Sequence, residues 1–201
     1  MKTVLMSIQP YYAYLETKGI KTIEVRKTEP KDKDWSGKVK VYVSQNKKSF
    51  NRIPKEDREW FSQYLGKVAY EFACNKVDKV INHGSNFKII DESIGYTNRV
   101  AEQSRLDFHD LKKYLETKDG YAWHITDLKV YDKPKELSDF RKLCIMSEMP
   151  YCPACKFGNI QYSSDEVECS RDIEGASCEW LCTNFVKRPP QIWQYIQELE
   201  D

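Results

Sequence analysis

The sequence predicts a mainly β, α+β protein: a small twisted β-barrel with short helices packed at its openings, followed by a cysteine-rich module. The expected strands outnumber the helices and do not alternate with them regularly, and the chain has no glycine-rich phosphate loop. A doubly wound α/β fold is therefore disfavoured. Most of the seven cysteines lie near the C-terminus. The 201 residues are expected to form a barrel domain over residues 1–143 and a cysteine-rich module with a tail over residues 144–201.

The first elements are expected to be a strand, a helix and two further strands. Alternating apolar side chains predict a strand over residues 1–8. Pro10 suits the first turn of a helix and Gly19 suits its C-terminal stop, so a helix of one to two turns is expected between them. Residues 21–27 and 37–43 alternate apolar and polar side chains, which predicts two more strands, the second of them the clearest in the chain.

The remainder of the barrel domain is expected to mix strands with two helices. An aromatic stripe predicts a helix over residues 56–65, and residues 66–80 predict one long, bulged strand. Residues 83–99 show no clean period and are expected to be irregular. A helix over residues 104–115 and a strand over residues 121–131 complete the domain.

Composition predicts a soluble protein, because 31% of the residues are charged and the mean hydropathy is −0.71. No run of about 18 apolar residues occurs, and the apolar start is too short for a signal peptide. An intracellular, cytoplasmic location without membrane contact is therefore expected. The net charge of +1 creates no global attraction to nucleic acid. Residues 18–55, however, carry twelve basic and four acidic side chains, so this stretch either faces phosphates or forms a solvated, lysine-rich rim.

A group of charged residues follows the glycine that ends the first predicted helix. In an extended chain Glu24 and Arg26 share one face, whereas Lys21 reaches them only from the turn before regular pleating begins. Converging Lys, Glu and Arg side chains would form a pocket for an anionic or polar planar ligand. The alternative is a plain ion pair between Glu24 and Arg26 on an edge strand, worth less than about 1 kcal/mol.

The pattern Gly19-x-Lys21-x-x-Glu24-x-Arg26 resembles the G-x-K-x-x-E-x-R signature of the ASCH domain family. Residues 7–10, Ser-Ile-Gln-Pro ahead of a short helix, are similar to that family as well. The resemblance implies a PUA-like β-barrel in which Lys21, Glu24 and Arg26 line a cleft that binds RNA or nucleotides.

Two neighbours of this group are further candidates for nucleic-acid binding. Lys27 extends the basic set, and Trp123 lies on one face of the predicted late strand together with Tyr121. A base stacked on Trp123 would gain about 1 to 3 kcal/mol. The alternative is that Trp123 packs in the core, as aromatic residues of strands usually do.

Hydrolysis is an alternative function, because some relatives of the ASCH family are ribonucleases or amidohydrolases that act on acetylated cytidine. The resemblance implies catalytic roles for Lys21, Glu24 and Arg26 if the chain is an enzyme. Those amidohydrolases carry threonine where this chain has Glu24, so the same covalent route is not expected. Glu24 would instead activate water or a ribose hydroxyl, while Lys21 and Arg26 stabilise the negative charge that develops.

The cysteines near the C-terminus predict a zinc knuckle with a structural zinc ion. The predicted ligands are four thiolates in two closely spaced pairs, Cys152, Cys155, Cys178 and Cys182. Cys169 competes for the place of either Cys178 or Cys182. Four thiolates would leave no open coordination position, so the ion is expected to supply folding energy rather than to catalyse hydrolysis.

The tail after the cysteines combines a basic pair with aromatic residues. Lys187 and Arg188 would serve as a nucleic-acid arm, whereas Trp193 and Ile196 would dock the tail onto the barrel. The whole arrangement resembles proteins of bacteriophages and of prophages in gut Firmicutes. That resemblance implies a bacterial, phage-infected host cell and says little about chemistry. A third hypothesis is a phage-encoded protein that binds a host defence or regulatory protein through the cysteine-rich module, around residues 156–171. The oligomeric state does not follow from the sequence.

Overall fold

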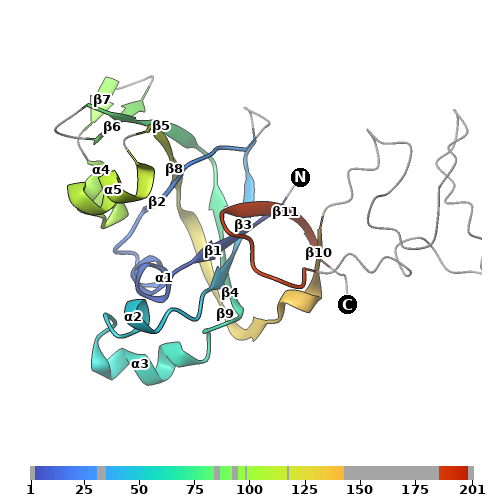
Figure 1. Ribbon diagram of the computed structural model, residues 1–201. Helices are drawn as coiled ribbons and strands as arrows, with labels where there is room; N and C mark the ends of the chain where they lie inside the picture. The colour runs from blue at the N-terminus through green and yellow to red at the C-terminus, as the bar shows by residue number, and fades with distance from the viewer. Residues whose placement is uncertain are drawn as a thin grey trace, which may run out of the picture.

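The computed structural model describes two β-sheets with short helices beside them (Figure 1). The residues described are 3–30, 35–83, 87–91, 95–97, 99–116, 118–142 and 186–198. The fold class is mainly β with short helices, as predicted. Within the described residues the strands form two sheets rather than one closed barrel.

The larger sheet has six strands and contains the first and the last strand of the described chain. In spatial order they are β10 (Phe140–Lys142), β11 (Trp193–Glu198), β1 (Thr3–Ile8), β3 (Gly37–Val43), β4 (Val68–Cys74) and β9 (Thr126–Lys135). Strands β1 and β3 pair in parallel, and the other neighbours in this sheet pair antiparallel. The predicted docking of the tail is therefore confirmed in the form of β11, in which Ile196 is buried.

The smaller sheet has five strands, all antiparallel to their neighbours. In spatial order they are β2 (Ile23–Arg26), β8 (Gly120–His124), β5 (Val77–Asn82), β6 (Phe87–Asp91) and β7 (Gly95–Thr97). Strand β2 is an edge strand of this sheet, and it carries the charged motif.

The helices form two groups (Figure 1). The first group, at one end of the larger sheet, contains α1 (Pro10–Thr17), α2 (Lys47–Phe50) and α3 (Lys55–Ser62). The second group, beside the smaller sheet, contains α4 (Val100–Ser104) and α5 (Phe108–Leu115). A short 3-10 helix, η1 (Leu137–Asp139), precedes β10. None of the helices that the structure describes is long and apolar enough to cross a membrane.

Helix α1 forms as predicted. Pro10 occupies its first turn, where the missing N–H costs nothing, and Gly19 follows its end with a positive φ of 68° that favours glycine. The helix buries Ala13, Leu15 and also the carboxyl group of Glu16. The position of α1 matters because the motif begins immediately after it.

Two predicted strands are each divided between the sheets. The stretch 66–80 forms β4 and β5, and the stretch 121–131 forms β8 and β9. In both cases the chain leaves one sheet and enters the other after one or two residues that belong to neither strand. The backbone N–H of His124 donates to the carbonyl of Lys76, which ties the two crossings together. The apolar positions change phase at each crossing, but no glycine or proline marks the change, so the sequence alone predicts one strand.

Residues 83–99 contain two short strands, β6 and β7, where the sequence predicts an irregular segment. Strands of five and three residues are too short to show a clear period. The predicted helix over 104–115 is α5 and begins later than expected, at Phe108, because Arg105 has a positive φ of 56° and Asp107 caps α5; Ser104 is the last residue of the separate helix α4. Helix α2, a single turn, has no counterpart among the predictions.

The main core lies between the larger sheet and the first group of helices, and it is rich in aromatic side chains. Trp123 is fully buried there, with its ring centroid 5.4 Å from that of Trp35 and 5.6 Å from that of Trp193. A second cluster joins the smaller sheet to α4 and α5. Ile23 and Val25 of β2 belong to this second cluster, which therefore holds α4 and α5 against that strand.

Several predictions concern residues outside the described part of the chain. These are the proposed zinc ligands Cys152, Cys155, Cys178 and Cys182, and the competing Cys169. The surface at residues 156–171, through which a host protein would bind, lies outside it as well. The division of the chain at residue 143 stays a prediction.

Candidate functional site

A cavity of about 560 Å³ lies where β1, α1, β2 and α5 meet. Lys21, Glu24 and Arg26 line it, and so does Lys27. Two tyrosines on different helices, Tyr12 of α1 and Tyr114 of α5, also contribute to its wall. Ligand cavities in proteins typically measure about 300 to 1,000 Å³, so this one has room for a ligand the size of a nucleotide.

The three charged residues of the motif converge on one carboxylate. Nζ of Lys21 lies 2.7 Å from Oε2 of Glu24, and Nη2 of Arg26 lies 3.0 Å from Oε1 of the same residue. All three side chains are nearly buried. The sequence-based expectation that Lys21 joins the other two from the turn therefore agrees with the geometry.

Local backbone structure explains how Lys21 reaches this position. The backbone N–H groups of Ile20 and Lys21 both donate to the carbonyl of Leu15, which closes the turn after α1. Lys21 lies before the first residue of β2, Ile23, so strand alternation does not fix its direction. Its ammonium group also donates to the backbone carbonyl of Ile23, which holds the side chain over the start of the strand.

Arg26 connects the motif to β1. Its Nη2 atom donates to the backbone carbonyl of Ser7 at 2.7 Å, in addition to its contact with Glu24. Among the atoms that the structure describes, Nε of Arg26 is buried and has no hydrogen-bond partner. Such a donor costs free energy unless a water molecule or a ligand accepts from it. The guanidinium group therefore retains capacity for a further acceptor.

Glu16 is a member of this cluster that the sequence analysis missed. Its Oε2 atom accepts a 2.6 Å hydrogen bond from the hydroxyl group of Tyr70, and its Oε1 atom lies 3.7 Å from Nζ of Lys21. Burial raises the pKa of Glu16 to about 8, although Lys21 opposes the shift. Its side chain is therefore mostly protonated at neutral pH. The one sequence signal is its position three residues after the buried Ala13 on the same helical face.

Glu24 behaves in the opposite way. Burial alone would raise its pKa, but the positive charges of Lys21 and Arg26 outweigh burial and hold the pKa below its ordinary value. Glu24 thus stays ionised, while the neighbouring Glu16 holds a proton. With two cations and one anion, the buried lining carries a net positive charge at neutral pH.

Lys27 lies at the rim of the cavity. It pairs with Glu116 at 2.6 Å and lies over the ring of Tyr114, 5.6 Å from its centroid. Lys113 and Asp110 of α5 also line the cavity, and Gln191 reaches it from the segment before β11. The rim therefore mixes both signs of charge and includes a residue from the C-terminal part of the chain.

Trp123 does not line the cavity. It is fully buried between two other tryptophans, and its indole N–H donates to the carbonyl of Thr28 at 3.3 Å. Of its two predicted roles, the structure places it in core packing. His124 is likewise engaged, since its Nε2 atom lies 2.7 Å from Oδ2 of Asp78.

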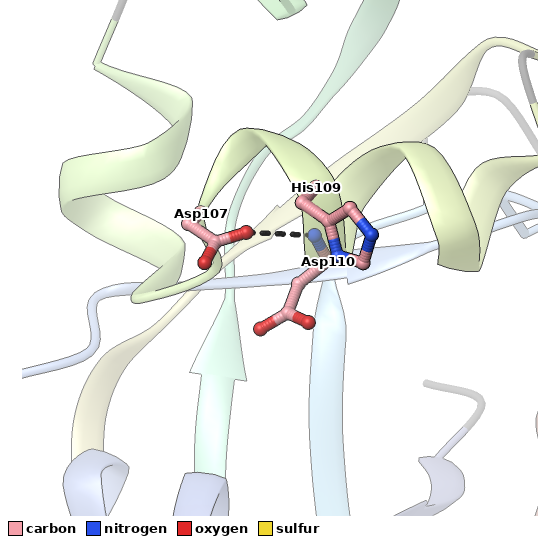
Figure 2. Close-up of side chains that lie close together, drawn as sticks. All are labelled: Asp107, His109 and Asp110. Atoms are coloured by element: carbon pink, nitrogen blue, oxygen red, sulfur yellow. Dashed lines mark hydrogen bonds between the residues drawn. The ribbon is translucent and has the colours of Figure 1, made fainter.

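A second group of polar side chains lies at the start of α5, where Asp107, His109 and Asp110 come close together (Figure 2). Potential ligand atoms of the three lie within 4.8 Å of one another. Asp107 is the N-cap of α5 and accepts a hydrogen bond from the backbone N–H of Asp110 at 2.7 Å. Helix capping accounts for the contact between Asp107 and Asp110; Asp107 and His109 are exposed, and Asp110 is half-buried.

Comparison with known proteins yields a distant structural likeness. No family model matches the sequence, and no curated protein matches it. The chain is similar in structure to ASCH from Zymomonas mobilis, with 16% sequence identity and a TM-score of 0.46 over 68% of this chain and 74% of that one. A mutant form of the same protein gives 16% identity and a TM-score of 0.45 over 68% of this chain and 77% of that one. The function is therefore argued from the residues of the cavity.

Proposed function

We propose that this protein binds RNA or a nucleotide in the cavity around Lys21, Glu24 and Arg26. The observation that carries the proposal is the ionised carboxylate of Glu24, which is held on both oxygens and lines a cavity of about 560 Å³. A carboxylate fixed in this way accepts hydrogen bonds from a ligand without having to reorient. The ASCH-like motif supports the same proposal.

The chemistry of the lining suits a nucleobase. Each carboxylate oxygen has two lone-pair positions, so Glu24 retains acceptor capacity for the amino or imino N–H groups of a base. Arg26, which lines the cavity and whose Nε has no partner among the described atoms, suits a base carbonyl or a phosphate oxygen. Tyr12 and Tyr114 offer aromatic rings for stacking, and Lys27 and Lys113 at the rim suit the backbone phosphates.

The ionisation of Glu24 favours binding over hydrolysis. A general base works best when its pKa lies near the working pH, whereas Lys21 and Arg26 hold the pKa of Glu24 low. Both oxygens of the carboxylate are also engaged by cations. Hydrolysis of RNA is nevertheless examined in the same experiment, by analysing the probes for products after incubation.

The test measures binding of the four nucleoside 5′-monophosphates and of four homopolymeric RNA decamers to the full chain. We expect at least one base to bind, and Glu24→Gln and Arg26→Lys to weaken that binding about tenfold or more, since each removes a charged hydrogen bond. Lys133→Ala, an exposed change on β9, is the matched control. Absence of binding, or equal affinity in wild type and both variants, would rule out the proposal.

For the cysteine-rich module we propose one structural zinc ion held by Cys152, Cys155 and the pair Cys178 and Cys182. The spacing of two thiolate pairs supports this set, and Cys169 is the competing ligand. Native mass spectrometry should show one zinc ion per chain. Cys152→Ser should lose it, and Cys169→Ser should retain it. Retention of zinc by Cys152→Ser with loss in Cys169→Ser would contradict this ligand set.

A further inference from the structure

Arg52 and two tyrosines, Tyr11 and Tyr12, form an aromatic and cationic surface next to the cavity. Arg52 follows α2, and the centre of its guanidinium group lies 4.0 Å from the ring centroid of Tyr11 and 5.4 Å from that of Tyr12. Its Nη1 atom donates to the hydroxyl group of Tyr12 at 3.3 Å. Because Tyr12 also lines the cavity, this surface, which we term the Arg52 platform (Tyr11, Tyr12 and Arg52), is continuous with the proposed binding site.

The backbone around the Arg52 platform is fixed by hydrogen bonds from both sides. Arg58 donates to the carbonyl of Asn51 at 2.6 Å and to that of Ile53 at 2.8 Å, so both neighbours of Arg52 are held. The backbone N–H of Tyr11 donates to the hydroxyl group of Ser49 at 3.1 Å, which joins α1 to α2. The guanidinium plane is thus positioned before any ligand arrives, which lowers the entropy cost of binding.

The charges beside the platform are suited to phosphate. Lys47 and Lys48 of α2 are exposed, and neither makes an ion pair within the part of the chain that the structure describes. Arg52 is itself exposed. Burial alone would lower the pKa of Arg52. The two tyrosines and Asp110, which also lines the cavity, outweigh burial and raise the pKa above its ordinary value. Three cations therefore extend from the edge of the cavity along α2.

We propose that the ligand is single-stranded RNA, with one base in the cavity and the adjoining base stacked on the open face of the Arg52 guanidinium plane. Lys47 and Lys48 contact the phosphates of that adjoining segment. This inference rests on the proposed function of the cavity. A base in a duplex cannot enter the cavity without leaving its stack, whereas an unpaired strand presents both a base and its neighbour. Arginine planes and tyrosine rings stack bases without strong sequence preference.

The experiment compares one base in two contexts on the full chain. For the base whose monophosphate binds best, affinities are measured for that monophosphate and for the matching RNA decamer, each at several salt concentrations. The variants are Arg52→Lys, which keeps the charge and loses the plane, and Lys48→Ala, which removes one phosphate contact. Lys133→Ala is the control for loss of a remote surface charge, and thermal unfolding of each variant verifies folding.

We expect the decamer to bind more tightly than the monophosphate. Arg52→Lys should weaken decamer binding about tenfold and leave monophosphate binding within twofold, because stacking of the adjoining base is lost. Lys48→Ala should lower the salt dependence of decamer binding by about one phosphate contact. A decamer that binds no more tightly than the monophosphate, or that is insensitive to Arg52→Lys, overturns this inference while the proposed function stands. Failure of every monophosphate and every decamer to bind overturns both.

Discussion

Two clusters in this protein each combine lysine, glutamate and tyrosine, and their difference shows what distinguishes a candidate site from a structural ion pair. Around β2, Lys21 and Glu24 meet Glu16 and Tyr70. On the larger sheet, Lys40 of β3 lies 2.9 Å from Glu71 of β4, whose carboxylate also accepts from Tyr131 at 2.8 Å.

In the cluster on the larger sheet the polar side chains satisfy one another, whereas the cluster around β2 contributes to the lining of the cavity. Lys40 and Glu71 face each other directly in the register of β3 and β4, and Lys38 and Tyr131 supply further partners. Around β2, by contrast, Nε of Arg26 is buried without a hydrogen-bond partner among the atoms that the structure describes. Lys21 and Glu24 line the cavity described above, whereas Lys40 and Glu71 do not. Position at a cavity, rather than charge alone, therefore distinguishes the candidate site from the structural ion pair.

The largest expected effect comes from removing the lysine at the centre of each cluster. Lys21→Met would leave Glu24 buried with one cation fewer, and breaking a buried pair costs about 3 to 5 kcal/mol of unfolding free energy. Lys40→Met should cost less, because Glu71 keeps Lys38 and Tyr131 and is partly exposed. Urea denaturation of both variants measures the difference. Equal losses would show that the two clusters do not differ as described.

Glu16 should make the protein less stable as pH rises. Its pKa is higher in the folded state, about 8 against 4.5, so its contribution is fully present below about pH 4.5 and is lost as pH approaches 8. The stability difference between pH 5 and pH 8.5 should therefore shrink in Glu16→Gln, by an amount on the order of 1 kcal/mol or more. Urea denaturation at the two pH values tests this. Glu59→Gln, an exposed carboxylate of α3, should leave the difference unchanged.

Glu71 should show a smaller effect in the opposite direction. Despite burial, Lys40 and Tyr131 lower its pKa to about 2, so its contribution is present above about pH 4.5 and is lost as the pH falls toward 2. Glu71→Gln should flatten the acid limb of the stability curve below pH 4.5, measured by thermal unfolding at pH 3 and pH 5. An unchanged acid limb would mean that these partners do not favour the ionised carboxylate.

The contrast also explains how much the sequence alone could predict. Helix α1, strand β2 and the convergence of the three charged side chains could be predicted because they depend on local features. These features are Gly19, the alternating residues after it and the spacing of Lys21, Glu24 and Arg26. Glu16 could not be predicted, because its burial depends on Tyr70, which lies 54 residues away.

The errors at the strand level have a similar cause. Where the chain passes from β4 to β5 and from β8 to β9, no glycine or proline marks the change of sheet, and a shift in the phase of the apolar positions is also what a bulge within one strand would give. The Arg52 platform was equally hidden, since it joins α1 to a single helical turn that has no periodic signal. Pairing between distant segments decides each of these features, and one sequence does not display it.

The position of β11 has a consequence for how the protein is made. Strand β1 lies between β3 and β11, so its second partner is supplied by residues 193–198. During synthesis, β1 leaves the ribosome long before residues 193–198, so one side of β1 stays unpaired until they emerge. An exposed edge on such an apolar strand invites association with other chains. Nascent chains halted before Trp193 should therefore depend on chaperones far more than the finished protein does.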